Sequence, residues 1–469
     1  MTVATEPAIK SYFFGKGYQD LINVIKESWK RNLTSASDFF SKIKLNGEWW
    51  ERIFTTVFWG GAALSVVVFG TLFFCLVSIL HIVFLGLFFT FIYLGFSIVW
   101  IVERIFLFFR GLFTTCPDCH SKRTLPEYFC DSCGEIHTKL MPNSYGILFH
   151  KCKCGQKLPA TFFVNRGRLQ ARCTVCNQLL HREHVESKKI FIPIFGGPSV
   201  GKSAFMFSVV RQLIEKKASE FGFTPEFIDS KTESIYQGVV KQLHKGSVPD
   251  KTTGKIPKAF NIALKNDGNT KWLIYLYDPS GEAYHDTENL SAHLYYGYLS
   301  GLIMIIDPFS IPYVRSKFEQ ELSKNWSEVK PSQLNIEDAL DRVLMTMEES
   351  FSLSKTGKIK KPIAVVINKV DAFGLENIIG EPAVNKALKA LSGKSDRNLV
   401  RNNLIKQQLI TWGEEAIVQQ LDSRFKKVHY FSCSALGRIP DHTNKDFVPH
   451  HVFESLQWIF NSVSRKDFS

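Results

Sequence analysis

Residues 189–203 read KIFIPIFGGPSVGKS. An apolar, β-rich run at 190–195 leads into a segment that satisfies G-x-x-x-x-G-K-[ST], the pattern of a phosphate-binding loop. The residues that follow, AFMFSVVRQL, have the apolar spacing of a helix. A strand, a glycine-rich turn and a helix in this order predict backbone N–H groups that point at phosphate oxygens, next to the positive end of a helix dipole. The alternative is a glycine-rich turn that fits the pattern by chance.

The side chains at the end of this loop are the ones that such chemistry requires. Lys202 is expected to reach the β- and γ-phosphates as a catalytic residue, and the Ser203 hydroxyl is expected to bind Mg²⁺. The nucleotide-binding residues predicted in the loop are Gly196, Gly197, Pro198, Ser199, Val200, Gly201, Lys202 and Ser203.

Two further motifs follow apolar runs that read as strands. Asp278-Pro-Ser-Gly281 comes directly after 271–277, so its carboxylate can hold Mg²⁺ through water and the Gly281 N–H can meet the γ-phosphate. Asn368-Lys369-Val-Asp371 follows 362–367. A carboxylate at Asp371 can accept hydrogen bonds from the ring N–H and the exocyclic amine of guanine, a donor pair that adenine lacks. Asn368 would support the loop, and the Lys369 stem would lie against the base.

The ordered set GGPSVGKS, DPSG, NKVD and SAL resembles the motifs of TRAFAC-class P-loop GTPases, over about 188–463. The resemblance implies an α/β domain of the Ras-like, doubly wound kind that binds GTP or GDP with Mg²⁺. It also implies a last base-contacting loop at Ser434, Ala435 and Leu436, and a switch threonine that binds Mg²⁺ and takes part in catalysis, best matched by Thr253.

One position departs from the Ras-like pattern. Glu282 stands where Ras-like proteins carry a glutamine soon after the D-x-x-G glycine. Glutamate can orient water as a catalytic residue, but it adds negative charge beside the phosphates, so slow hydrolysis without a partner is expected. The overall plan also resembles bacterial conflict-system GTPases, including the double-GTPase families.

Composition limits the class of protein. The chain has 469 residues, which allows about three domains. Hydrophobic residues make up 45% and charged residues 22%, values that fit a globular chain with a membrane segment and exclude a disordered one. The net charge of +13 is compatible with phosphate ligands, an anionic membrane surface or nucleic acid. The first fifteen residues lack the apolar core of a cleavable signal peptide.

A long apolar stretch predicts membrane association. Residues 53–102 contain no Asp, Glu, Lys or Arg. One helix of this length would far exceed a hydrocarbon core of ~30 Å, so two spans are expected at 53–77 and 83–102, with a turn at 78–81. The alternative is a buried helical hairpin in a soluble core. Basic residues on both flanks predict an integral membrane protein with both termini in the cytoplasm, in the inner membrane if the source is bacterial.

Eight of the ten cysteines lie in four closely spaced pairs. Two C-x-x-C knuckles can complete a tetrahedral zinc site, so two Cys₄ sites resembling zinc ribbons are predicted, in a reducing compartment. Redox-active cysteines and iron–sulfur ligation are the rival interpretations. The sequence leaves open which pairs share an ion. The predicted zinc ligands are Cys116, Cys119, Cys130, Cys133, Cys152, Cys154, Cys173 and Cys176.

These patterns divide the chain into an amphipathic segment (1–51), a transmembrane hairpin (52–110), a tandem zinc-ribbon-like region (111–187) and a P-loop GTPase domain (188–469). The segment 1–51 reads either as an interfacial helix on the bilayer or as a helix that packs on another part of the chain.

The leading hypothesis is a membrane-anchored GTPase switch, in bacterial defence or stress signalling. The alternative is a non-enzymatic, nucleotide-dependent scaffold or membrane effector whose zinc ribbons recruit a partner. A protein partner or a homo-oligomer is expected. Nucleic acid is less favoured, because two Cys₄ zinc sites would offset most of the positive charge of the cysteine region.

Overall fold

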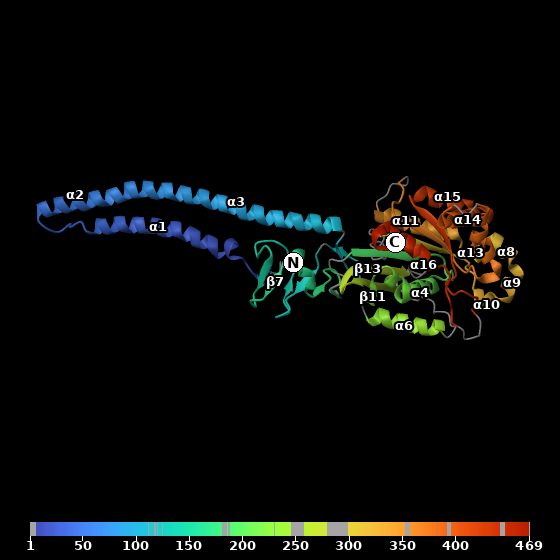
Figure 1. Cartoon of the computed structure of the whole chain (residues 1–469). Helices are drawn as coiled ribbons and strands as arrows, with labels where there is room; N and C mark the ends of the chain where they lie inside the picture. The colour runs from blue at the N-terminus through green and yellow to red at the C-terminus, as the bar shows by residue number, and fades with distance from the viewer. Residues whose placement is uncertain are drawn as a thin grey trace. The chain divides into compact units, whose positions relative to one another are not determined.

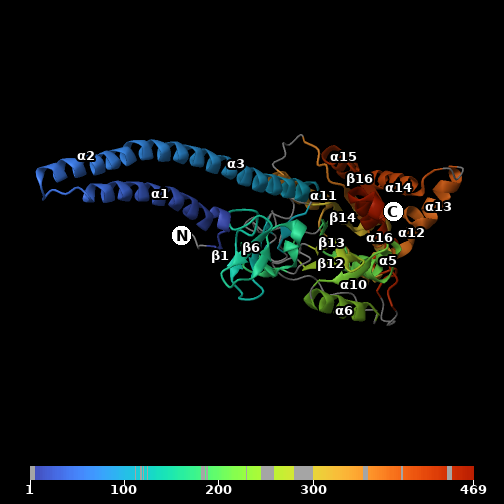
Figure 2. The same cartoon turned by 60° about the vertical axis from the view of Figure 1, so that its left-hand side comes forward.

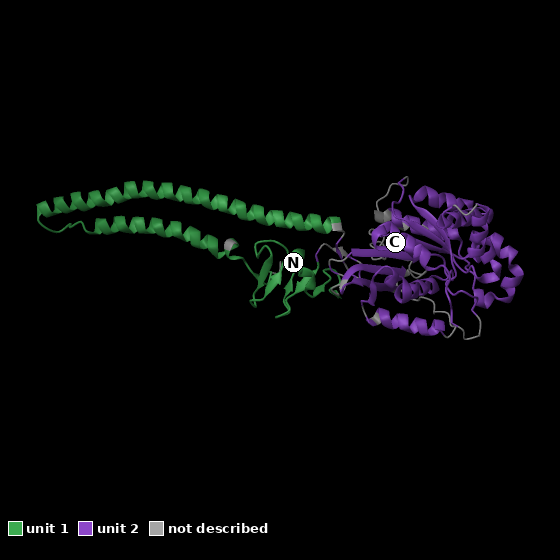
Figure 3. Ribbon diagram, viewed as in Figure 1, with its two compact units in different colours: residues 1–110, 126–182 green, residues 111–125, 183–469 purple. Residues whose placement is uncertain are grey.

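A computed structural model describes residues 6–110, 112–116, 119, 121–123, 125–180, 185, 188–228, 230–244, 258–278, 299–351, 357–391, 395–440 and 446–468. The chain forms two compact units, shown in different colours in Figure 3. Unit 1 comprises residues 1–110 and 126–182, and unit 2 comprises residues 111–125 and 183–469.

Unit 2 is built on a seven-stranded sheet in the order β11-β12-β13-β10-β14-β15-β16. The strands β10, β13, β14, β15 and β16 run parallel, whereas β11 and β12 join antiparallel at one side. The bounds are β10 (Lys188–Phe195), β11 (Thr224–Phe227), β12 (Lys258–Asn266), β13 (Asn269–Asp278), β14 (Leu302–Ile306), β15 (Ile363–Ile367) and β16 (Val428–Ser432). This architecture confirms the predicted α/β fold.

Helices cover both faces of this sheet because its central strands are apolar on both sides. Along β14, Ile303 and Ile305 pack into one core and Met304 into the other, as the two-residue period of a strand requires. The first core takes side chains of α4 (Lys202–Gln212), α6 (Ser230–His244) and α16 (Phe453–Val463). The second takes those of α11 (Ile336–Phe351), α14 (Arg397–Thr411) and α15 (Glu415–Arg424).

Short elements complete unit 2. They are β2 (Thr114–Thr115), β3 (Lys122–Arg123), α5 (Ala218–Glu220), α8 (Pro312–Lys317), α9 (Glu319–Lys324), α10 (Trp326–Val329), α12 (Glu376–Ile379), α13 (Glu381–Ala390) and α17 (Arg465–Phe468). Of these, α8, α9 and α10 lie between β14 and α11 in the chain.

In unit 1 the apolar stretch is one continuous helix. It consists of α2 (Trp49–Ser65), a π-helical turn (Val66–Gly70) and α3 (Thr71–Arg110). Among the described residues it alone has the length and hydropathy to cross a membrane. The predicted turn at 78–81 is therefore wrong. These four residues, SILH, include no glycine or proline that would end a helix, and the Ser78 hydroxyl accepts a hydrogen bond from Trp29 Nε1 at 3.0 Å without any chain reversal.

The chain reverses instead at 42–48, between α1 (Lys16–Ser41) and α2. Figures 1 and 2 show α1 running back along the long helix. Phe39 stacks on Trp59, Trp29 reaches Ser78, and Tyr18 stacks on Phe89, so the two helices are antiparallel. The amphipathic N-terminal segment thus packs on another part of the chain, one of the two interpretations that its sequence allowed.

The rest of unit 1 is a small β module. Two sheets have the orders β1-β6-β7 and β5-β4-β8-β9. Their strands are β1 (Ala8–Ile9), β4 (Glu127–Phe129), β5 (Ile136–His137), β6 (Phe149–Cys152), β7 (Lys157–Pro159), β8 (Ala171–Arg172) and β9 (Leu179–Leu180). The cysteines of these strands and their turns are considered below.

The end of α3 is fixed to this module by a buried ion pair. Glu103, the first charged residue after the apolar stretch, is 2% exposed, and Arg166 is fully buried. Their side chains lie 3.0 Å apart, and Glu103 Oε1 also accepts from the Phe162 backbone N–H at 2.7 Å. Arg166 Nη1 donates to the carbonyls of Leu140 and Ala160. Each charge therefore has the partners that burial demands.

We expect Arg166→Met to destabilise unit 1 by about 3–5 kcal/mol, because it leaves the Glu103 carboxylate buried and unpaired. Chemical denaturation of the detergent-solubilised protein, followed by near-UV circular dichroism, measures the change. The matched control is Arg168→Met, which alters an exposed arginine two residues away. Equal unfolding midpoints for the two variants would contradict the role given to the ion pair.

Candidate nucleotide-binding site and metal centre

The phosphate-binding loop joins β10 to α4 and needs its glycines for steric reasons. Gly201 has a φ of +91° and Gly196 one of +157°. A Cβ added at Gly196 would lie 2.4 Å from the Ile305 carbonyl oxygen, and one at Gly201 would lie 2.5 Å from Asn368 Nδ2. Any side chain at either position would push the loop away from its neighbours. The loop geometry therefore depends on close backbone approach to β14 and to Asn368.

Lys202 begins α4 with its ammonium folded over the loop. The side chain is 8% exposed, and Nζ donates to the carbonyl oxygens of Gly196 at 3.0 Å and Gly197 at 2.9 Å. Positive charge is thus held against the backbone turn where phosphate would bind. The Ser203 side chain follows in the first turn of the same helix.

Asn368 connects three loops at the carboxyl edge of the sheet. Its Nδ2 donates to the Val200 carbonyl at 3.0 Å, and its Oδ1 accepts from the Ala435 N–H at 3.0 Å. Its own N–H donates to the Ile306 carbonyl at 3.0 Å. With 2% exposure, this amide is a buried link between the phosphate loop, the end of β14 and the Ser434–Leu436 segment.

The Ser434–Leu436 segment is held from two further sides. Ser208 of α4 donates its hydroxyl hydrogen bond to the Ala435 carbonyl at 2.7 Å. Ser434 and His450 exchange two backbone hydrogen bonds of 3.0 and 2.9 Å. Next to them, Glu454 lies 2.7 Å from His451 Nδ1 and raises the pKa of that imidazole. Burial raises the pKa of the Cys433 thiol, which keeps it neutral under the segment.

The half-buried Lys369 and the fully buried Asp307 form an ion pair that the sequence did not predict. Lys369 Nζ lies 2.7 Å from Asp307 Oδ2 and 2.9 Å from the Ser199 carbonyl of the phosphate loop. Asp307 is fully buried and also accepts from the N–H groups of Phe309 and Ser332. From the sequence alone, Asp307 fits either a pocket residue or a strand-end turn residue. Its position directly after an apolar, strand-like run was the signal in the sequence, whereas the pairing of β14 with β15, which brings it to the Asn-Lys motif, appears only in the fold.

The described part of the site includes only some of the predicted residues. Asp278 ends β13, next to β10 in the sheet, and Asp371 is half-buried just after the Lys369 turn. Thr253, Gly281 and Glu282 lie outside the described residues. The structure thus brings the phosphate loop, Asn368, Lys369 and the Ser434–Leu436 segment together, and nucleotide binding by these residues stays a prediction.

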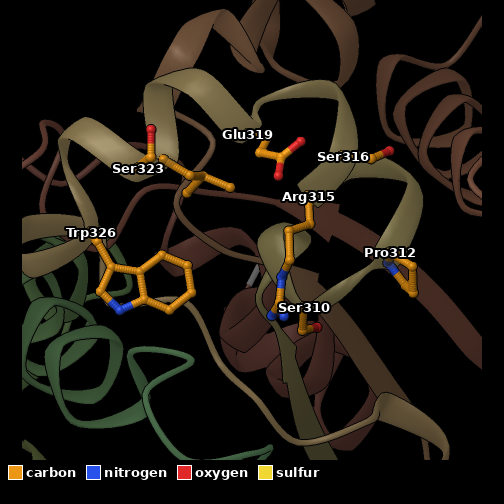
Figure 4. A pocket seen from close by; sticks show the side chains of 8 residues that line it. Ser310, Pro312, Arg315, Ser316, Glu319, Ser323 and Trp326 are labelled. Carbon is orange, nitrogen blue, oxygen red and sulfur yellow. The ribbon is translucent and has the colours of Figure 1, made fainter.

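A segment after α10 lies against the phosphate loop. A Cβ on Gly197 would lie 2.9 Å from Ser332 Oγ. Arg315 of α8 donates to the Ser332 carbonyl at 2.8 Å and to the Phe309 carbonyl at 2.9 Å, so it braces this segment. Figure 4 shows Arg315 among the residues that line a pocket of 470 Å³ on α8, α9 and α10, together with Glu319 and Trp326.

The candidate metal centre is a cluster of four cysteines in the β module. Cys130 and Cys133 follow β4, and Cys152 and Cys154 lie at the turn between β6 and β7. The Sγ atoms of Cys130 and Cys154 are 3.6 Å apart, as are those of Cys133 and Cys152. Tetrahedral thiolate ligation with Zn–S bonds of ~2.3 Å needs sulfurs roughly 3.8 Å apart, so these four residues fit a zinc ion.

The sequence left open which cysteine pairs lie together, and this cluster answers that question for two of the four pairs. A C-x-x-C pair and the C-x-C pair form one cluster. Of the other predicted ligands, Cys173 and Cys176 lie in the turn between β8 and β9 of unit 1, and Cys116 and Cys119 belong to unit 2. A second zinc site from those four cysteines stays a prediction.

A comparison with known protein families gives a match to part of unit 2. The model of a family described as Double-GTPase 2 matches residues 190–421. This match supports a P-loop GTPase domain of the double-GTPase kind in unit 2. It includes the phosphate loop and the Asn368–Asp371 motif and ends before β16.

Three solved structures with similarity to the chain have low sequence identity and TM-scores below 0.5. They include the Saccharomyces cerevisiae Ski7 GTPase-like domain bound to GTP (13% identity, TM-score 0.30, 59% of this chain and 51% of that one). LeoA, a bacterial dynamin GTPase from ETEC, has 9% identity and a TM-score of 0.26 over 60% of this chain and 33% of that one. The G domain of the Thermotoga maritima FeoB iron transporter has 12% identity and a TM-score of 0.23 over 59% of this chain and 99% of that one. The chain thus spans about half of the Ski7 structure and a third of LeoA. No curated protein matches the sequence.

We expect Asp307→Asn to weaken guanine-nucleotide binding roughly 10-fold or more, because a charge-assisted hydrogen bond to Lys369 contributes about 1.5–3 kcal/mol. Titration with a fluorescent GDP analogue measures the loss. Glu319→Gln, in the pocket of the same domain, is the control and should bind normally. Unchanged affinity in Asp307→Asn would show that the buried pair does not position Lys369 for binding.

We expect Cys133→Ser to remove one zinc ion per chain, because three thiolates hold the ion far less tightly than four. Metal analysis of the purified protein measures the stoichiometry. Cys75→Ser, which changes an exposed cysteine of α3 outside the cluster, should keep all bound zinc. Equal zinc content in both variants would contradict the assignment.

Proposed function

We propose that this protein is a membrane-associated GTPase that hydrolyses GTP to GDP and phosphate and works as a molecular switch. The observation that carries the proposal is the buried Asn368 amide, which ties the phosphate loop to the predicted guanine-binding segments at 3.0 Å on each side. The family match supports the same class of protein.

Each element of the site would have a separate task. The loop N–H groups and Lys202 would bind the phosphates, and the Asp371 carboxylate would select guanine through two hydrogen bonds. The Lys369–Asp307 pair would keep the Lys369 stem against the base. Mg²⁺, held by Ser203, Asp278 and Thr253, would neutralise phosphate charge during transfer. Glu282 would leave turnover slow until a partner acts.

The switch would be read out through the rest of the chain. Bound GTP would order the segments around Thr253 and Gly281, and hydrolysis would release them. The zinc-ribbon-like module would then present or withdraw a surface for a protein partner or a second copy. The resemblance to conflict-system GTPases favours a role in bacterial defence or stress signalling.

A nucleotide-dependent scaffold without turnover is the second candidate. It is favoured by Glu282, whose charge beside the phosphates opposes hydrolysis. Protein that carries stoichiometric nucleotide after purification and shows no turnover would support it.

We expect Lys202→Ala to reduce GTP turnover roughly 100-fold or more, because it removes the charge that stabilises the transferring phosphate. Asp371→Asn should lower the preference for GTP over ATP, because it loses the acceptor pair for guanine. Phosphate release from GTP and ATP measures both effects. Lys386→Ala, an exposed lysine on α13, is the control. Wild-type turnover in Lys202→Ala, or wild-type selectivity in Asp371→Asn, would refute the corresponding assignment.

A further inference from the structure

The long helix of unit 1 does not fit an upright crossing of a bilayer. Its charge-free stretch, 53–102, has 50 residues and is about 75 Å long at 1.5 Å per residue, against a hydrocarbon core of ~30 Å. An upright helix would leave about 45 Å of apolar surface in water. Matching the two lengths by tilt alone needs roughly 66° from the membrane normal, beyond the usual range of 0–40°.

The charged residues of α1, the helix that packs along the long helix, also argue against an upright arrangement. Lys26, Glu27, Lys30 and Arg31 are exposed on α1, around the point where Trp29 reaches Ser78 of the long helix. Ser78 is near the middle of the charge-free stretch, so an upright hairpin would place these four charges at the bilayer centre. Charges there are costly unless they pair or line a water-filled cavity.

The two helices together have one apolar side and one charged side. Phe54, Leu72 and Phe91 of the long helix are each more than 60% exposed, whereas Ala63 is fully buried, and Gly70 lies against Asn32 of α1. In the most apolar part of the long helix, only 6% of the residues are buried. The stretch 16–44 carries six Lys and Arg residues against three Asp and Glu residues. An apolar layer beside a net basic layer complements an anionic membrane surface.

We propose that the α1–α2–α3 hairpin lies along the cytoplasmic leaflet without crossing the bilayer. The long helix is embedded among the acyl chains and α1 faces the headgroups. The helix leaves the leaflet at Glu103, whose burial against Arg166 fixes it to the water-exposed β module. The occupant of the apolar surface is therefore lipid. This inference rests on the membrane association in the proposed function and specifies its geometry.

Single cysteines test this geometry in the full chain. Gly47→Cys reports on the tip of the hairpin and Leu80→Cys on the middle of the long helix. Both are made in a Cys75→Ser protein. Labelling of the Cys75→Ser protein without either new cysteine measures the background from the remaining native cysteines. A membrane-impermeant maleimide is added to spheroplasts and to inside-out membrane vesicles of a bacterial expression host. Detergent-solubilised samples establish that both introduced thiols react.

An in-plane hairpin predicts that Gly47→Cys is labelled only in inside-out vesicles and that Leu80→Cys is labelled only after detergent. Labelling of Gly47→Cys only in spheroplasts would mean an upright continuous helix. Labelling of Leu80→Cys only in spheroplasts would mean two spans. Either result overturns the inference but leaves membrane association intact.

Flotation with anionic vesicles separates the inference from the proposal beneath it. Wild-type protein is expected to float with phosphatidylglycerol vesicles. If it stays in the soluble fraction, the membrane part of the proposed function fails, and the inference that rests on it fails as well. Cross-linking of Leu80→Cys between two chains of that soluble protein would show that a second copy covers the apolar surface.

Discussion

The side-chain amide of Asn368 is the contact on which the nucleotide site depends. This side chain, 2% exposed, donates to the Val200 carbonyl of the phosphate loop and accepts from the Ala435 N–H, so it holds two separate loops in one arrangement. A buried amide can do this because its donor and its acceptor are fixed in one plane, point in different directions and are both satisfied. Gly201 is required for the same reason, since a Cβ there would occupy the space of Asn368 Nδ2.

Each unit contains an ion pair, and the two pairs have different roles. In unit 2, the buried Asp307 pairs with the half-buried Lys369 next to the phosphate loop, and hydrogen bonds from the Phe309 and Ser332 N–H groups satisfy the rest of the carboxylate. In unit 1, Glu103 and Arg166 form a buried pair at the end of an apolar helix. The first pair orients a residue of the site, whereas the second fixes the last part of the long helix to the β module.

Local patterns were sufficient for much of the site because its elements are short and continuous in the chain. The strand, loop and helix around Lys202 follow from glycine spacing and apolar period alone. The position of Asn368 at the end of a buried strand follows in the same way. The role of Asp307 could not be predicted, because it depends on β14 and β15 being neighbours in the sheet and on Lys369 folding back toward Ser199.

The sequence by itself determined the α/β domain, its phosphate loop and the presence of paired cysteine ligands, since each rests on residues close together in the chain. Only the tertiary structure decided that Cys130 and Cys133 meet Cys152 and Cys154, because strand pairing brings the knuckles together. It also decided that 53–102 forms one helix with α1 alongside. Hydropathy predicts which stretch of the chain is apolar. The position of the chain reversal depends on contacts between distant residues, such as the hydrogen bond between Trp29 and Ser78.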